Sequence, residues 1–252
     1  EELLQILELD ADNSPYSLEA LAQFPLKAPR PSVDRIAKGN WHDPLLMQIW
    51  PSVAEEAQAE GFVADPLNEE EFNPIPGLLH KYQGRVLLTA APHCAVHCRY
   101  CFRRHFDYRA NSPSRAQWER AFSYIGNDSS IEEVILSGGD PLALSDSQFQ
   151  WLLQRLADIG SLTTVRIHTR LPVVIPQRIT SELVRCLSES RLNIVMVLHC
   201  NHRQELDSEV GAGIDALSDV GVTMLNQAVV LKDVNDNSRA LIDLNKALFR
   251  HN

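Results

Sequence analysis

The sequence lacks the features that mark membrane, secreted and nucleic-acid-binding proteins. Its 252 residues contain no run of about 18 apolar residues, so it offers no membrane-spanning helix. No charged start followed by an apolar segment is visible, so we expect no secretory signal. The formal net charge of −10 argues against nucleic acid as a direct partner, because phosphate binding needs a basic surface. We therefore expect a cytoplasmic globular protein without a membrane partner.

Cysteine is scarce and unevenly distributed. Of the five cysteines, Cys94, Cys98 and Cys101 share the stretch CAVHCRYCFRRHF with the spacing C-x3-C-x2-C, whereas Cys186 and Cys200 are isolated. Three thiols this close do not form a normal disulfide framework, and in a reducing compartment clustered cysteines more often bind metal. The same stretch gathers arginines and histidines in an otherwise acidic chain. A metal centre is therefore the first hypothesis for this loop.

Proline separates two parts of the chain. Nine of the fourteen prolines lie in the first 80 residues, where short helical patterns such as 17–24 and 43–50 occur between them. We expect residues 1–80 to form a small helical region and residues 81–252 to form the main domain.

Residues 81–252 show a repeating pattern of β-branched apolar runs and amphipathic segments. Strand starts recur about every 30 residues after the first unit, which is typical of βα units, and the runs are apolar on both parities, as in buried parallel strands. The pattern predicts an α/β fold with a parallel barrel or a doubly wound sheet. The expected strands are Arg85–Ala90, Glu133–Leu136, Thr164–His168, Asn193–His199 and Thr223–Val230. The expected helices are Ser114–Ile125, Ser145–Asp158, Thr180–Ser188, Glu209–Val220 and Ser238–Phe249.

A polar motif follows each predicted strand. Cys94 follows the first strand, SGGDPL (137–142) the second, HTRLP (168–172) the third, HCNH (199–202) the fourth and LKDVND (231–236) the fifth. The carboxyl ends of parallel strands are the edge at which α/β folds bind ligands. We expect these motifs to surround one site.

Two metal centres fit three thiols. Zinc usually takes four ligands, and the fourth could be one of three histidines, so a zinc-stabilised binding protein is one alternative. These histidines are His93, His97 and His105. A [4Fe–4S] cluster held by only three cysteines is the other alternative, and it would leave one iron open to a further ligand.

The spacing C-x3-C-x2-C after the first strand of a βα barrel resembles the radical S-adenosylmethionine (SAM) superfamily, in which the open iron is chelated by SAM. The stretches CRYCFRRHF, SGGDPL, RIHTRLPVVIPQRI, LHCNH and LNQAVVLKDVNDN resemble lysine 2,3-aminomutases, and in particular the bacterial branch that prepares β-lysine for elongation factor P. The resemblance runs from about residue 25 to the end. It implies a partial (βα)6-type barrel over residues 81–252. It also implies an isomerase that converts L-lysine into β-lysine with a [4Fe–4S] cluster, SAM and pyridoxal 5′-phosphate (PLP).

The resemblance implies ligands for the cluster and for SAM. Cys94, Cys98 and Cys101 would hold the cluster, with Arg99, Arg103 and Arg104 offsetting its charge. The methionine end of SAM would lie on four residues after the second strand, where glycine permits close approach and an aspartate could accept from an ammonium group. These four are Ser137, Gly138, Gly139 and Asp140. A plain turn after the strand is the alternative for this segment.

The remaining implied positions concern the substrate and PLP. Arg103 matches the arginine that grips the substrate carboxylate, which a guanidinium suits because it offers paired donors; simple charge compensation is the alternative. Strand-end residues would contact SAM or PLP, or serve as hydrogen-bonded structural residues: His168, Arg170, His199 and Gln227. Tyr82 and Arg85 match positions near PLP and the adenosyl group, or else cap the barrel edge.

Lysine 2,3-aminomutases continue with a sixth βα unit and a segment that bears the PLP-binding lysine. We therefore expect this chain to be a fragment and that catalytic lysine to lie beyond Asn252. The implied partners are L-lysine, an electron donor such as flavodoxin, and a functional link to elongation factor P and its lysyl-transferring enzyme; a homo-oligomer is also expected. A radical SAM enzyme without PLP is the rival enzyme hypothesis.

Overall fold

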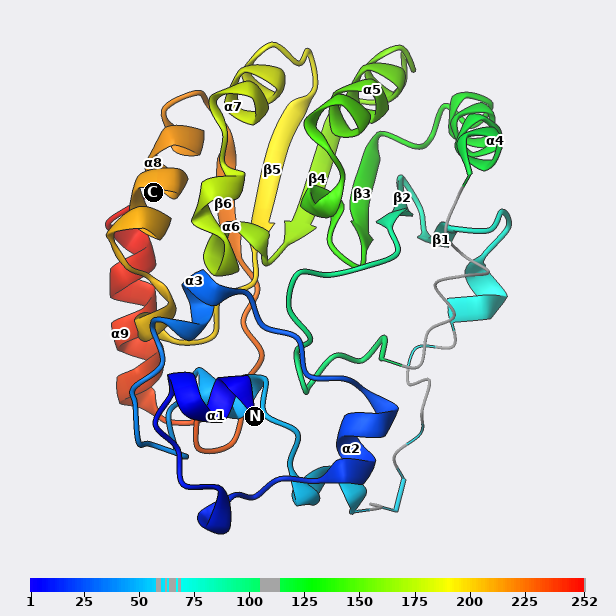
Figure 1. The fold of residues 1–252 in the computed structure, drawn as a ribbon. Helices are drawn as coiled ribbons and strands as arrows, with labels where there is room; N and C mark the ends of the chain where they lie inside the picture. Colours follow the sequence, from blue (N-terminus) through cyan, green and yellow to red (C-terminus); the bar gives the residue numbers. More distant parts are fainter. Residues whose placement is uncertain (58–59, 62, 64–66, 68, 105–113, 252) are drawn as a thin grey trace.

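A curved six-stranded sheet forms the centre of the molecule in the computed structural model, which describes residues 1–57, 60–61, 63, 67, 69–104 and 114–251 (Figure 1). The strands lie in chain order: β1 (Leu78–Tyr82), β2 (Arg85–Ala91), β3 (Glu133–Gly138), β4 (Thr164–Thr169), β5 (Asn193–Leu198) and β6 (Thr223–Asn226). β1 is antiparallel to β2, and each later pair is parallel. The predicted α/β class and partial radical SAM barrel are confirmed.

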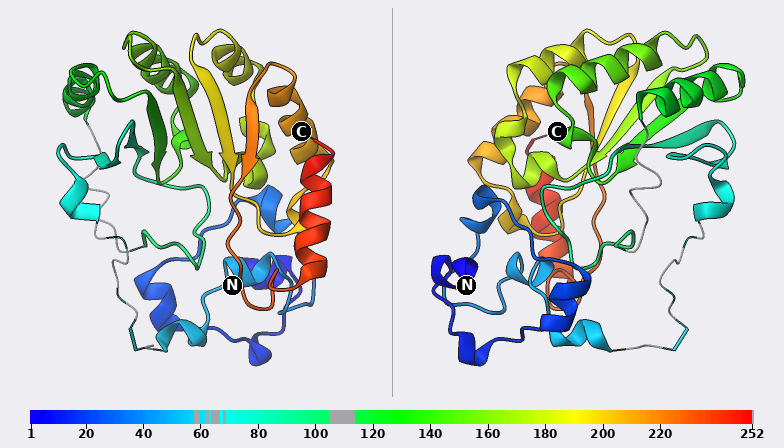
Figure 2. Two further views of the ribbon diagram at one scale, coloured as in Figure 1. Left: turned by 180° about the vertical axis from the view of Figure 1, so that it is seen from behind. Right: turned by 45° about the vertical axis from the view of Figure 1, so that its right-hand side comes forward.

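Helices cover the outer face of this sheet (Figure 2). The helices that follow the parallel strands are α4 (Arg115–Gly126), α5 (Asp146–Ala157), α7 (Ser181–Ser188), α8 (Ser208–Ser218) and α9 (Ser238–Phe249). Each begins after a residue whose side chain accepts a backbone N–H of the first turn, which stabilises the helix start. These capping residues are Ser114, Ser145, Thr180, Asp207 and Asn237.

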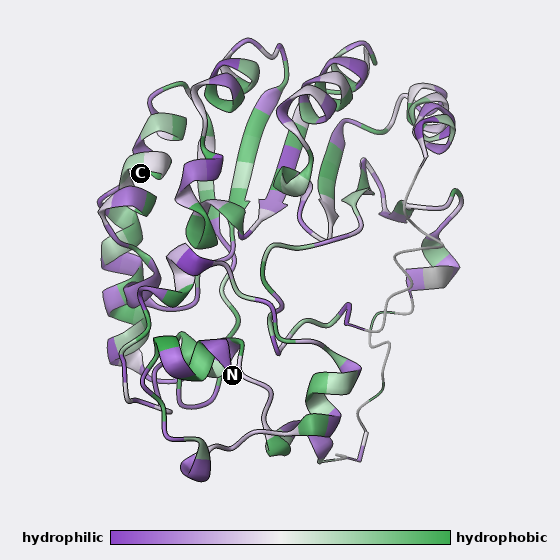
Figure 3. Ribbon diagram, viewed as in Figure 1, coloured by the Kyte–Doolittle hydropathy of each residue, from purple (hydrophilic) through white to green (hydrophobic). Residues whose placement is uncertain are grey.

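The core lies between the helices and the sheet. One side of each helix is apolar, and β3 and β5 are hydrophobic along most of their length (Figure 3). In α5, Phe149, Leu152 and Leu156 are fully buried in the same cluster as Val165 and other strand residues. Burying one such side chain contributes about 1.5–3 kcal/mol, so this layer supplies most of the driving force that closes βα units onto one another.

The last strand is shorter than predicted. The apolar run suggested Thr223–Val230, but β6 ends at Asn226, whose side-chain amide pairs with the backbone N–H and C=O of Cys200. Beyond it, the Val229 N–H donates to the Asn201 side chain, and Asn235 donates to the Val229 carbonyl. Side-chain amides thus form the hydrogen bonds to backbone groups that a neighbouring strand would form if β6 were longer.

Residues 1–57 lie beyond the carboxyl ends of the strands (Figure 1). Their helices are α1 (Glu2–Ile6), α2 (Leu18–Gln23) and α3 (Arg30–Val33), and a separate apolar cluster contains residues of α1 and α3. That cluster also takes in Val96 and Val174 of the main domain. The expected boundary at residue 80 falls inside β1, and the division into two parts stays a prediction.

Short helical turns complete the fold. They are α6 (Leu171–Val174) and the 3-10 turns Ala11–Asn13, Leu46–Gln48, Val53–Glu56, Glu69–Phe72, Pro141–Ala143, Pro176–Arg178 and Arg203–Glu205. Within the part of the chain that the structure describes, none of the helices is both long and apolar enough to cross a membrane.

Candidate active site at the carboxyl ends of the strands

The two faces of β4 differ in burial and polarity. Val165 and Ile167 are fully buried under the helices, whereas the alternate residues Thr164, Arg166 and His168 are only half-buried. This is the period of two that side chains follow along a strand. On the side away from the helices, β4 therefore presents polar and titratable side chains.

The three clustered cysteines lie in the loop after β2, at the carboxyl ends of the strands. All are free thiols of intermediate exposure. The loop is tied to the N-terminal region, since Lys27 Nζ donates to the Cys94 carbonyl at 2.6 Å and the Arg99 N–H donates to the Gln48 carbonyl at 2.9 Å. The sequence prediction that these thiols lie at this edge is thus met by the fold.

The thiols lie near one another but do not converge. Burial raises the pKa of the Cys94 thiol, and the negative charges of Asp140, Cys98 and Cys101 raise it further. Across the described residues, no three His, Cys, Asp or Glu side chains surround a common metal position. The donor set of three thiols in one short loop suits an iron–sulfur cluster held by three ligands.

The neighbouring arginines are paired with glutamates. Arg99 and Arg104 both donate to Glu55, at distances of 2.7–2.9 Å. Arg103 pairs with both carboxylate oxygens of Glu69, at 2.6 and 2.9 Å, and also donates to Ser137 Oγ at 3.2 Å. The structure therefore brings two predicted site residues, Arg103 and Ser137, into contact. The role of Arg103 in substrate binding stays a prediction.

The glycine pair after β3 allows two loops to pack closely. Gly138 has a φ of +112°, a region that favours glycine. A Cβ on Gly139 would lie 2.4 Å from the carbonyl oxygen of His93 in the cysteine loop. The pair thus holds the end of β3 against the loop that carries the thiols, whether or not it also contacts SAM.

Asp140 is buried and fully engaged within the protein. Its carboxylate accepts from Thr169 Oγ1 at 2.7 Å, and from the backbone N–H groups of Leu142, Arg170 and Leu171 at 2.8–3.1 Å. Burial raises its pKa, against the lowering effect of these donors. This arrangement fixes the start of α6 beneath the cysteine loop. Its predicted contact with SAM stays a prediction.

His168 and Gln227 meet on the inner face. Burial lowers the pKa of His168, as do the positive charges of Arg166 and Arg103, while the negative charge of Glu133 and a hydrogen bond with Gln227 oppose this. The ring nitrogen Nε2 of His168 is buried without a hydrogen-bond partner among the described residues. A neutral imidazole with one uncommitted nitrogen is suited to a ligand contact.

A buried polar network that the sequence did not predict joins His199 and Arg170. His199 stacks on Tyr100, with 5.4 Å between ring centroids, and its Nε2 lies 2.9 Å from the Tyr100 hydroxyl. Arg170 donates to the same hydroxyl. The network also contains three residues that the sequence analysis did not single out. These are Gln48, Asn201 and Glu205.

Tyr82 and Arg85 lie at the opposite end of the strands. Tyr82 is 65% exposed in β1, and Arg85 pairs with Glu133 at 3.3 Å at the start of β2. Arg166 pairs with the same carboxylate at 2.6 Å. Since a strand rises about 3.3 Å per residue, this basic group lies about 20 Å from the cysteine loop. The structure does not bring Tyr82 and Arg85 together with the other predicted residues.

The histidines considered as zinc ligands are differently placed. His97 lies over Phe24 and its Nδ1 contacts the Pro25 carbonyl at 2.8 Å, so its ring is engaged by the N-terminal region. His93 lines a groove with Lys27 and Cys94. His105 falls outside the described residues.

The low pKa of His199 predicts a pH-dependent stability. Burial, and then the positive charge of Arg170, lower its pKa to about 4 from the ordinary 6.5. Between pH 4 and pH 6.5 the unfolded chain binds a proton at this position that the folded protein does not bind. The contribution of His199 to the free energy of unfolding is therefore fully present above pH 6.5. It is lost as the pH falls towards 4, by up to about 3 kcal/mol. Urea unfolding of cluster-free protein from pH 7.5 to 5 should show this loss.

His199→Gln should reduce that slope, whereas the same change at the exposed His42 should not. Equal slopes for His199→Gln and the parent protein would contradict the assignment.

The fold and the cysteine loop define a radical SAM protein, and the family model described as the Radical SAM superfamily matches residues 88–197. The chain is 49% identical over 98% of its length to "L-lysine 2,3-aminomutase" of Haemophilus influenzae, 73% of which it spans. It is 46% identical over 99% of its length to the protein of that name in Escherichia coli, of which it also spans 73%. A Clostridium subterminale relative of the same name is 38% identical over 77% of this chain and 47% of its own.

The chain belongs to the lysine 2,3-aminomutase family. Membership makes it an isomerase of the radical SAM type, with a [4Fe–4S] cluster, SAM and PLP as its cofactors. The zinc alternative for the thiols is thereby set aside, as is the radical SAM enzyme without PLP.

Proposed function

We propose that this chain carries the radical SAM core of an enzyme that converts L-α-lysine into β-lysine. The observation that carries the proposal is the 49% identity over 98% of the chain to a protein named L-lysine 2,3-aminomutase, with the C-x3-C-x2-C loop placed at the carboxyl ends of parallel strands. When bound, the cofactors supply a 5′-deoxyadenosyl radical and a carbonyl group that holds the migrating nitrogen.

The residues of this chain would provide the binding and the orientation. Cys94, Cys98 and Cys101 would hold the cluster, and the segment 137–140 together with His168, Arg170, His199 and Gln227 would line the SAM end of the inner face. Arg103, next to Ser137, would orient the substrate carboxylate. Tyr82 and Arg85 lie at the opposite end of the strands, where Arg85 and Arg166 pair with Glu133, so we do not assign them to this site.

Along β4, polar side chains lie on the inner face of the sheet and apolar side chains lie under the helices. The half-buried residues of β4 line the enclosed side, where a dry, shaped surface would protect a carbon radical from water. The N-terminal region lies across the carboxyl ends of the strands and ties down the cysteine loop through Lys27 and Gln48. It would thus help to exclude solvent from that end.

Anaerobic reconstitution tests the proposal. Full-length protein, including the C-terminal segment expected beyond Asn252, is treated with iron and sulfide and should hold about four irons and four sulfides per chain rather than one zinc. With SAM, lysine, PLP and a chemical reductant it should form 5′-deoxyadenosine and β-lysine, and omission of lysine should prevent β-lysine formation. Zinc in place of iron, or deoxyadenosine without β-lysine, would contradict the assigned reaction.

The finer assignments belong to the same proposal. The product would serve elongation factor P and its lysyl-transferring enzyme, as the resemblance of the motifs to that bacterial branch implies. The protein would act in the cytoplasm, take its electron from a donor such as flavodoxin, and assemble as a homo-oligomer.

A further inference from the structure

We propose that Arg170 is a positioning residue of the iron–sulfur centre: it donates an N–H···S hydrogen bond to Cys98 and so raises the reduction potential of the cluster. The inference rests on the proposed function only in requiring the cluster. The sequence resemblance placed Arg170 among the contacts of SAM or PLP, whereas the structure turns its guanidinium towards a thiol.

The geometry of the contact is direct. Arg170 precedes the short helix α6, and its Nη1 lies 2.7 Å from Cys98 Sγ. The same nitrogen donates to the Tyr100 hydroxyl two residues further along the cysteine loop. Arg170 is only 8% exposed, so little water competes for these bonds. Its backbone N–H is held at 2.8 Å by Asp140, which fixes the point from which the side chain extends.

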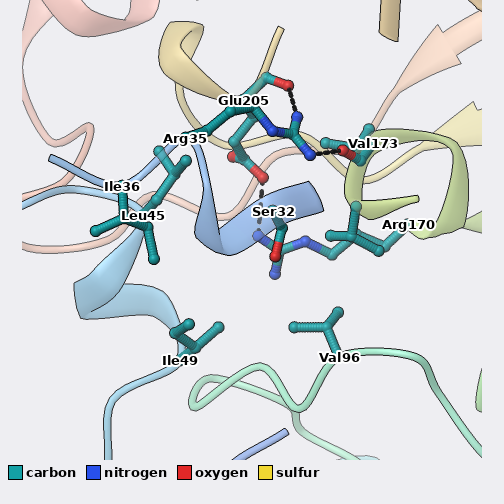
Figure 4. A pocket seen from close by; sticks show the side chains of 10 residues that line it. Ser32, Arg35, Ile36, Leu45, Ile49, Val96, Arg170, Val173 and Glu205 are labelled. Atoms are coloured by element: carbon teal, nitrogen blue, oxygen red, sulfur yellow. Dashed lines mark hydrogen bonds and ion pairs between the residues drawn. The ribbon is translucent and has the colours of Figure 1, made fainter. Parts of the chain in front are cut away.

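The guanidinium is locked in this direction by a buried partner. Nη2 donates to Glu205 Oε2 at 2.8 Å, in the ion pair seen in Figure 4, and to Gln48 Oε1 at 2.7 Å. Glu205 is 3% exposed, and its other carboxylate oxygen accepts from the Asn201 and His202 backbone N–H groups at 2.8 and 2.9 Å. A buried pair whose remaining acceptors are satisfied is held firmly, because either charge left alone would be costly.

The hydrogen bond from Arg170 to Cys98 would change the reduction potential of a bound cluster. Reduction adds a negative charge to the cluster and its thiolates, and a donor or a positive charge beside one sulfur stabilises the reduced form. Arg170 supplies both at Cys98. Of the loop arginines, Arg99 and Arg104 direct their side chains to Glu55 and Arg103 directs its own to Glu69.

Arg99 offers a matched control. It is also 8% exposed and ion-paired, and it lies next to Cys98 in sequence, but its guanidinium donates to Glu55 and to the carbonyls of Phe24 and Ala20. Arg170→Gln and Arg99→Gln therefore each remove one buried charge near the loop, and only the first removes a donor to sulfur.

The test is a redox titration monitored by electron paramagnetic resonance on anaerobically reconstituted protein, without SAM or lysine. Arg170→Gln should have a more negative cluster potential than both the parent protein and Arg99→Gln. An unchanged potential, or the same shift in both variants, would overturn it.

A second variant covers the case in which Arg170→Gln fails to fold because Glu205 is left unpaired. Arg170→Met combined with Glu205→Leu removes both charges, and such replacements of buried ion pairs are often neutral or stabilising. Its cluster should likewise be harder to reduce, and a parental potential in this variant would overturn the proposal. Since lysine is absent from the titration, failure of the β-lysine assay would disprove the proposed reaction without affecting this comparison.

Discussion

Replacement of Cys94, Cys98 or Cys101 by alanine is expected to remove the iron–sulfur chromophore and to reduce 5′-deoxyadenosine and β-lysine formation below detection. With only three thiols available, the loss of one leaves two ligands for a cubane that normally takes four. His97, one histidine of this loop, is engaged by Phe24 and Pro25 rather than placed as a substitute ligand. Iron and sulfide analysis of each reconstituted variant, followed by the product assay, gives the measurement.

Cys186→Ala is the matched control. This thiol lies on α7, is also of intermediate exposure, and is far in the sequence from the loop. It should keep the full iron content and activity. A loop variant that retained four irons and parental activity would show that the thiols do not hold the cluster.

Asp140→Ala is expected to destabilise the protein by about 3–5 kcal/mol. The substitution leaves three buried donors without their acceptor: the Thr169 hydroxyl and the N–H groups of Leu142 and Arg170. The Leu171 N–H loses one of its two acceptors and keeps Thr169 Oγ1. Each unsatisfied buried donor costs about 1–3 kcal/mol, and partial relaxation of the loop keeps the total below the sum. Urea unfolding monitored by circular dichroism measures the change.

Asp128→Ala provides the comparison for Asp140→Ala. Like Asp140, Asp128 is a hydrogen-bond acceptor in a loop. It accepts two bonds, from the backbone N–H and the hydroxyl of Ser130, but it is exposed to water. Its loss should shift the urea midpoint only slightly. Equal shifts for the two variants would show that Asp140 is not the structural centre of its loop.

The secondary structure of the barrel was largely predictable from the sequence, because residues close in sequence determine where its helices and strands begin. The expected helix Ser238–Phe249 has the same bounds in the structure, and the expected start of helix Ser114–Ile125 is the capping residue of α4. Strand starts at Arg85, Glu133 and Thr164 are also as predicted. Apolar periodicity and capping side chains are encoded within a few residues, so they can be interpreted without knowledge of the fold.

Other features depend on contacts between distant residues and gave no local signal. β1 was not predicted, because its first three residues were assigned to the proline-rich region and the segment becomes a strand only by pairing with β2. Glu205 is a buried carboxylate only because Arg170, 35 residues earlier, meets it. Likewise, the sequence placed Arg85 near the other site residues, but Arg85 begins β2 and the other site residues follow the carboxyl ends of the strands.

The alternation of buried apolar and half-buried polar side chains along β4 determines which positions of this strand can change during evolution. Val165 and Ile167 are confined by the helices above them, so their side chains can change little without a loss of folding. Arg166 and His168 alternate with them but face the enclosed side, where a new side chain alters recognition at small cost to packing. A lineage can therefore acquire a different substrate preference through alternate positions of a single strand while the neighbouring positions remain constrained.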